Sequence, residues 1–109
     1  MRYAALCLFF GSLCQAGEFT GYISDAACGW NNARSSPEAK ECARKCVNVG
    51  WDPVFVRDGE MNTFKISDKR AVLAFVGEHV AIEGQLKGDT VTVRKIRKVT
   101  KASGKRKGS

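Results

Sequence analysis

The 109-residue sequence lacks most of the patterns that indicate an enzyme. No glycine-rich loop precedes a predicted helix, so no phosphate-cradling turn is indicated. There is one histidine, His79, no Ser/His/Asp set, and no pair of carboxylates at a spacing that suits acid–base catalysis. The longest apolar run, residues 4–10, is far shorter than the roughly 20 residues of a membrane-spanning helix. We therefore expect a non-catalytic protein with no transmembrane segment in the mature chain.

The first 16 residues have the pattern of a secretory signal peptide. Arg2 precedes the apolar run, and Cys14 and Ala16 place small residues at positions −3 and −1 of a cleavage site before Gly17. The alternative is an ordinary buried first helix, but no polar face interrupts the apolar run. The pattern predicts export to the periplasm or to the extracellular space.

The basic charge of the protein is concentrated at its carboxyl end. Residues 17–93 carry 9 basic and 11 acidic side chains, whereas residues 94–109 carry 8 basic side chains and no acidic one. We expect residues 100–109 to be a disordered tail that attracts anionic surfaces or nucleic acid weakly, or that only aids solubility. No aromatic residue follows Phe75, so base stacking beside the tail is not indicated. The cations of the tail are Lys101, Lys105, Arg106 and Lys107.

The alternation of apolar and polar residues predicts one mainly β domain over residues 17–99. The predicted strands cover residues 18–24, 53–57, 61–67, 78–86 and 90–99, and the predicted helices cover residues 37–48 and 68–76. Five strands in the order β–α–β–β–α–β–β fit an OB-like barrel with a cysteine-bearing helical insert at residues 35–49. The alternative is a flat antiparallel α+β sheet with both helices on one face.

Local signals support these boundaries. Ser36 is a suitable helix N-cap with Pro37 at the first helical position, and the Asp58–Gly59 pair is typical of a hairpin turn. Gly21 and Gly84 lie within predicted strands, where a small closed sheet must bend sharply. The inward-facing register slips after Val93, which predicts a β-bulge near residues 94–95.

Removal of the signal peptide leaves three cysteines, Cys28, Cys42 and Cys46. Thiols tend to oxidise outside the cytosol, so an odd number requires an explanation. Cys42 and Cys46 are four residues apart, so they lie on one face of the predicted helix, where a disulfide between them would be strained. Cys28 lies in the preceding loop and can reach that face.

Three roles follow for these thiols. In the first, Cys28 forms a disulfide with Cys42 or Cys46, which closes a loop of about 15 residues and contributes up to about 3 kcal/mol. In the second, all three sulfurs bind Cu⁺ or Zn²⁺, with His79 as the available fourth ligand. In the third, Lys45 lowers the pKa of a redox-active thiol, although the sequence has no C-x-x-C motif.

Two tryptophans flank the cysteine helix. Trp30 precedes it and Trp51 follows it. Both rings pack beneath the loops in one interpretation, and as an exposed pair they line a small binding face in the other.

Several of these segments together resemble a group of small secreted bacterial proteins of unknown function. The segments are Gly21-Tyr22-Ile23-Ser24-Asp25-x-x-Cys28-Gly29, Cys42-x3-Cys46-Val47-x-x-Gly50, Gly77-x-x-Val80-x-Ile82-x-Gly84 and Gly88-Asp89-Thr90-Val91-x-Val93. The resemblance covers residues 17–99 and implies export and an OB-type barrel with a cysteine-bearing insert. It implies no activity. Members often carry a histidine soon after the Cys-Gly pair, whereas residues 30–34 of this chain contain none.

Three functions therefore remain from the sequence. The first is an exported, non-catalytic binding or structural module stabilised by a disulfide through Cys28. The second is a periplasmic protein that binds Cu⁺ or Zn²⁺ through its cysteines. The third is a weak electrostatic binder of nucleic acid or anionic surfaces that acts through the basic tail.

Overall fold

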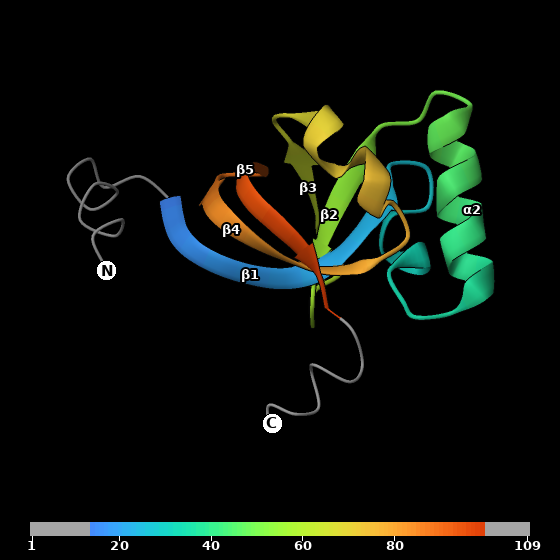
Figure 1. Cartoon of the computed structure of the whole chain (residues 1–109), viewed down its shortest axis with the longest axis horizontal. Coiled ribbons are helices and arrows are strands. Elements are labelled where there is room, and N and C mark those ends of the chain that lie inside the picture. Colours follow the sequence, from blue (N-terminus) through green and yellow to red (C-terminus); the bar gives the residue numbers. More distant parts are fainter. Residues whose placement is uncertain (1–13, 100–109) are drawn as a thin grey trace.

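The computed structural model describes residues 14–99 as a β-barrel with one α-helix beside it (Figure 1). Its elements are β1 (Cys14–Asp25), η1 (Gly29–Asn32), α2 (Pro37–Asn48), β2 (Pro53–Arg57), β3 (Thr63–Ile66), η2 (Lys69–Phe75), β4 (His79–Lys87) and β5 (Thr90–Lys98). The basic tail and most of the predicted signal peptide, residues 100–109 and 1–13, lie outside the described residues. Within the described part of the chain, no helix has the length and apolar character needed to cross a membrane.

The five strands close into a barrel in the order β1-β2-β3-β5-β4. Neighbouring strands are antiparallel except β3 and β5, which pair in parallel through Lys65 with Thr90 and Ile66 with Val91. Strand β1 pairs with both β2 and β4 and so completes the barrel. The prediction of an OB-like barrel with a helix between the first two strands is confirmed, and the flat-sheet alternative is wrong.

Strand β1 is longer than its sequence pattern indicates. It begins at Cys14, before the predicted cleavage site and four residues before the predicted strand start at Glu18. Residues 14–22 pair with β4, and residues 21–25 pair with β2. The early residues do not alternate in polarity, so their strand structure depends on the partner strand.

Two close approaches between strands account for the two predicted mid-strand glycines. A Cβ atom on Gly21 would overlap the backbone of Val56, and one on Gly84 would overlap the carbonyl oxygen of Thr92. The β4–β5 register shifts between Glu83 and Gly84, which face Lys95 and Val93, so that Arg94 is the extra residue of β5. The predicted bulge is therefore confirmed, and it lies beside the close approach at Gly84.

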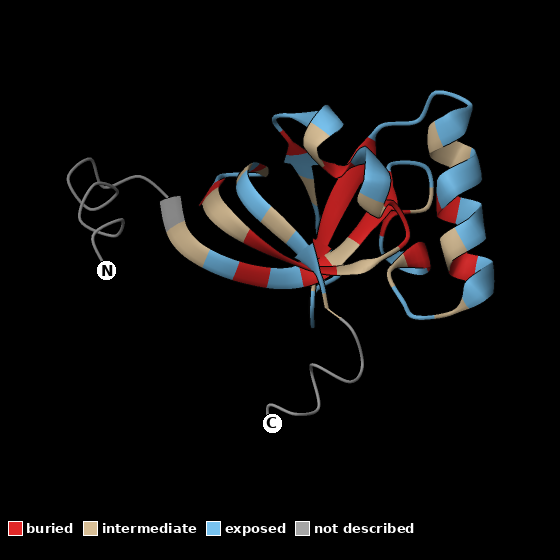
Figure 2. Cartoon of the chain, in the orientation of Figure 1, coloured by how far each residue is buried: buried red, intermediate tan, exposed pale blue. Residues whose placement is uncertain are grey.

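One apolar core fills the barrel, and most of its buried side chains lie on the strands (Figure 2). Ile23, Phe55 and Ile82 are fully buried at its centre. Element η2 covers one end with Val72, while Leu73 is exposed. The reason is that η2 is a 3-10 helix with three residues per turn, so Leu73 lies off the side that Val72 presents to the core.

Helix α2 has the predicted boundaries. The Ser36 hydroxyl accepts a hydrogen bond from the Ala39 backbone N–H at 3.0 Å, and Pro37 occupies the first helical position. The two buried residues of α2 are Ala39 and Ala43, one turn apart. Small side chains on this face let the helix lie close to the barrel wall.

Candidate functional site

The loop that carries Cys28 is organised around a fully buried carboxylate, Asp25, at the end of β1. Its Oδ2 atom accepts a hydrogen bond from the Cys28 backbone N–H at 2.9 Å, and its Oδ1 atom accepts one from Asn32 Nδ2 at 2.9 Å. The neighbouring Ser24 hydroxyl donates to the Gly29 carbonyl at 2.7 Å. These bonds fix the start of the loop, and Cys28 with it, against the barrel.

Helix α2 presents the other two thiols to this loop. Cys42 and Cys46 lie one turn apart, next to the buried alanines. Cys42 is exposed, whereas Cys28 and Cys46 are partly buried. The Cys28 thiol lies close enough to the thiols of Cys42 and Cys46 for both of them to act on its pKa. The structure thus brings the three cysteines together, each as a free thiol.

The surroundings of the cluster favour protonated thiols. Desolvation, followed by the charge of Asp25 and a hydrogen bond donated to that carboxylate, raises the pKa of Cys46 from an ordinary 9.0 to about 11. Desolvation and then Asp25 also raise the pKa of Cys28. Both directions oppose the lowered pKa expected from Lys45, so the surroundings of Cys46 do not support the prediction of an activated, redox-reactive thiol there.

The proposed metal ligands do not all meet. His79 Nε2 lies 2.8 Å and 3.1 Å from the two carboxylate oxygens of Asp58, and its ring stacks on Tyr22 with centroids 4.5 Å apart. His79 therefore lies at the start of β4, and it is not among the groups that shift the pKa of Cys28 or Cys46. Across residues 14–99, no group of three or more His, Cys, Asp and Glu side chains is arranged to hold a metal ion.

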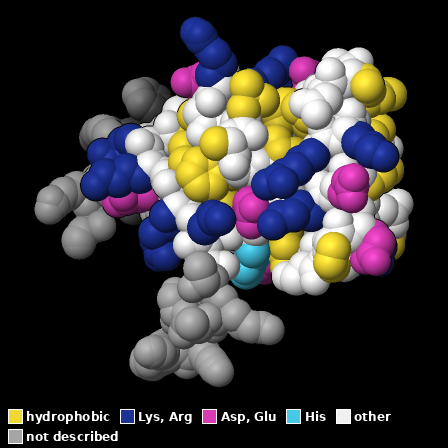
Figure 3. Space-filling model, turned by 45° about the vertical axis from the view of Figure 1, so that its right-hand side comes forward, with side chains coloured by type: hydrophobic (Ala, Val, Ile, Leu, Met, Phe, Trp, Pro, Cys, Tyr) yellow, Lys and Arg dark blue, Asp and Glu magenta, His cyan; other side chains and the backbone are white. Residues whose placement is uncertain are grey.

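The two tryptophans are partly accessible. Trp30 and Trp51 are each 51% exposed and lie outside the apolar core. The space-filling view shows apolar side chains exposed in patches among basic and acidic ones (Figure 3). Half-exposed rings are compatible with packing on one side and with a ligand on the other, so a role of Trp30 and Trp51 in binding stays a prediction. The tail cations, including Lys101 and Lys105, lie outside the described residues.

Sequence reasoning missed the residue at the centre of the site. An aspartate three residues before Cys28 has the spacing of a capping contact, in which the carboxylate accepts from the third following backbone N–H, so a signal for Asp25 existed in the sequence. No local pattern identifies Asn32 as its second partner, because that contact depends on how the 3-10 turn η1 folds back.

Comparison with protein-family models, with curated proteins and with solved structures finds no match to this chain. The fold and the thiol cluster are therefore interpreted from the chain's own residues.

Proposed function

We propose that the protein is an exported, non-catalytic binding or structural module whose helical insert is tied by a disulfide from Cys28 to one of the α2 cysteines. The observation that carries this proposal is that the thiols of Cys42 and Cys46 both lie close enough to Cys28 to act on its pKa. A disulfide requires these side chains to move, because all three cysteines are free thiols in the structure. The buried Asp25 already holds the loop in place, which lowers the cost of bringing the sulfurs together.

The bond forms by exchange with an external disulfide such as oxidised glutathione. One protein thiolate attacks the external disulfide and releases a thiolate, and a second protein thiolate then displaces the other external sulfur. Two protein thiols are oxidised, the external disulfide is reduced to two thiols, and one protein cysteine remains free. The cross-link closes a loop of roughly 15 residues and stabilises the folded state by up to about 3 kcal/mol.

The surroundings of the two helical cysteines favour Cys42 as the partner. Desolvation, followed by Asp25, raises the pKa of Cys46 to about 11, which disfavours the thiolate that attacks a disulfide. Cys42 is exposed to an external oxidant. We therefore propose the pairing Cys28–Cys42, with Cys46 left as the free thiol.

Intact mass with and without alkylation tests the proposal on protein recovered from the exporting host. We expect a chain that begins at Gly17, a loss of two hydrogens, and one alkylated thiol after denaturation without reductant. Peptide mapping should identify the Cys28–Cys42 linkage. Cys46→Ser should keep the cross-link, whereas Cys28→Ser should lose it and melt at a lower temperature. Three titratable thiols in the air-exposed native protein would overturn the proposed disulfide, and retention in the cytosol would overturn export.

Binding of a soft metal ion is a second candidate, because Cys28, Cys42 and Asp25 all lie close enough to Cys46 to act on its pKa. Thiolates bind Cu⁺ or Zn²⁺, so a bound cation would have to displace the protons that the surroundings of Cys28 and Cys46 favour. The donor atoms are not arranged as a metal site, so this candidate ranks below the disulfide. Anaerobic protein should then hold about one equivalent of Cu⁺ that Cys46→Ser abolishes. Metal-free protein under those conditions would exclude it.

A further inference from the structure

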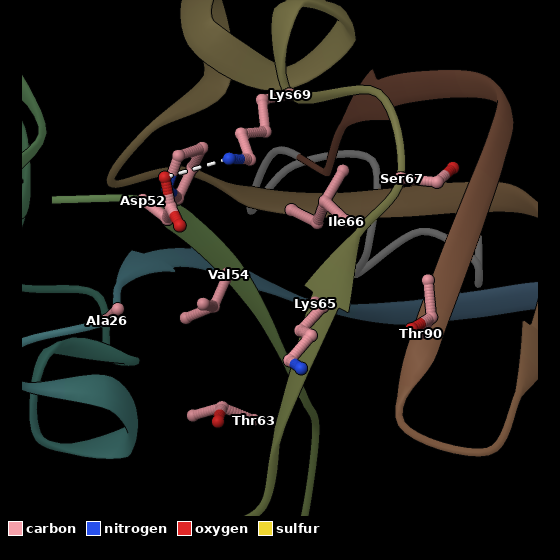
Figure 4. Close-up of a pocket in the computed structure, with 10 residues that line it drawn as sticks. Ala26, Asp52, Val54, Thr63, Lys65, Ile66, Ser67, Lys69 and Thr90 are labelled. Carbon is pink, nitrogen blue, oxygen red and sulfur yellow. Dashed lines mark hydrogen bonds and ion pairs between the residues drawn. The ribbon is translucent and has the colours of Figure 1, made fainter.

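A cavity of about 540 Å³ lies beside strands β2 and β3 of the barrel (Figure 4). It is formed where the loop after β1, the starts of β2 and β5, strand β3 and the start of η2 come together. Pockets that bind small molecules have volumes of roughly 300–1,000 Å³. The cavity is therefore large enough for a small ligand, and its walls come from segments far apart in the sequence.

The lining of this cavity combines an apolar base with a basic and hydroxyl-bearing rim. Val54 and Ile66, from neighbouring strands, are buried and supply the apolar part. Lys65 and Lys69 supply two ammonium groups, and Thr63 supplies one of three hydroxyls. Ligand sites typically combine an apolar base with a small number of well-placed polar groups.

The rim carries the two ammonium groups and the Asp52 carboxylate, which leaves one positive charge in excess. Lys69 Nζ lies 2.9 Å from Asp52 Oδ1, and Figure 4 shows Lys69 reaching across to that carboxylate. Lys65 Nζ lies 3.9 Å from Asp89 Oδ2, and Asp89 is not part of the lining. All four side chains are more than half exposed, and ion pairs of this kind contribute little stability. A ligand anion can compete for both lysines at small cost.

We propose that this cavity binds a small amphipathic anion. Its carboxylate or phosphate group lies between Lys65 and Lys69, and its apolar body lies on Val54 and Ile66. Such an anion would be the ligand of the proposed binding module, and its binding requires neither the disulfide nor export. The Ala26 backbone N–H donates to the Asp52 carbonyl at 2.9 Å, so the wall formed by the cysteine loop is joined to the start of β2.

Three eight-carbon probes that differ in charge test this site on the full chain by amide chemical shifts. Octanoate should shift the amides of residues 65–67 saturably. Because one charge-assisted contact is lost, 1-octanol should bind at least about tenfold more weakly. Octylammonium should bind more weakly still. Absence of saturable shifts, shifts centred elsewhere, or equal affinity for octanoate and 1-octanol would overturn the proposal.

A matched pair of double variants separates a built site from general attraction. Lys65→Ala with Lys69→Ala should weaken octanoate binding by at least about tenfold. Lys95→Ala with Lys98→Ala removes the same charge from exposed positions of β5 outside the cavity and should leave the affinity unchanged. Equal losses in both variants would overturn the proposal. The same titration on Cys28→Ser distinguishes the two proposals. This variant cannot form the proposed disulfide and should still bind octanoate.

Discussion

In the barrel, side chains from all five strands meet in one apolar core, whereas the insert of residues 26–52 meets the barrel largely through small and polar groups. Phe55 and Ile82 are fully buried among other apolar side chains. Helix α2 buries only Ala39 and Ala43. The first turn of the insert is fixed by hydrogen bonds to Asp25 rather than by apolar packing.

This difference shows where each kind of interaction is needed. Burial of large apolar side chains stabilises the barrel without any specific polar contact. An insert that buries two alanines gains little from that source, so it depends on a satisfied buried carboxylate, on ion pairs to the barrel and, as we propose, on a disulfide. The insert is also the part whose stability should respond to redox state and pH, because it carries the thiols.

The largest effect is expected from a cavity in the barrel. Phe55→Ala removes a fully buried ring and should lower the free energy of unfolding by about 3–5 kcal/mol. Denaturant unfolding followed by circular dichroism measures the change. Leu73→Ala, at a half-exposed position, is the matched control and should cost far less. Similar losses for the two variants would contradict the assignment of the core.

A smaller and more local effect is expected at Asp25. Asp25→Ala leaves the Cys28 N–H and the Asn32 amide without their acceptor and should cost about 1–3 kcal/mol. Hydrogen exchange should accelerate in residues 26–52 more than in β4 and β5. Asp25→Asn keeps one acceptor oxygen and should recover part of the loss. Uniform acceleration across the chain would show that Asp25 supports the barrel as much as the insert.

The sequence was sufficient for most of the barrel. The β-branched and aromatic run over Pro53–Arg57 and the cap at Ser36 with Pro37 are local signals, and the structure follows both. The same reasoning placed the bulge at Arg94, because the inward-facing register changes there. The early part of β1 was missed, since Cys14–Gly17 becomes a strand only through pairing with β4.

The site was less predictable for the same physical reason. The spacing of Cys42 and Cys46 places them on one helix face, which requires no tertiary information. The partners of Asp25 are brought together only by the folded loop and helix, and they include Asn32 and the Cys46 thiol. Because Asp25 and Cys46 lie together only in the folded protein, the raised pKa of Cys46 could not be predicted from the sequence. The basic neighbour Lys45 predicted a lowered pKa instead.

A loss of about 0.5–1 kcal/mol in the free energy of unfolding is expected from a substitution at the contact between α2 and the barrel. Glu78 Oε2 lies 3.0 Å from Lys40 Nζ and 3.2 Å from Arg44 Nη2, so Glu78→Gln removes two ion pairs between the two regions. The loss should shrink at high salt, because screening already weakens such pairs. Glu83→Gln, which affects an ion pair between β4 and β5, is the control and should leave exchange in α2 unchanged. An equal effect of Glu83→Gln on α2 would contradict a local joint at Glu78.

The last difference between the two regions develops only above pH 9, where the Cys46 thiol begins to titrate. In the reduced protein, desolvation and Asp25 raise the pKa of Cys46 from 9.0 to about 11, so between these values the unfolded chain releases a proton that the folded chain keeps. Stability therefore falls as pH rises through this window, and the contribution of Cys46 is complete below pH 9 and lost above about 11. Urea unfolding of the reduced wild type and of Cys46→Ala at several pH values isolates the contribution, because lysine and tyrosine titration is common to both proteins. A difference between the two curves that stays constant from pH 8 upward would show that Asp25 does not act on the Cys46 thiol.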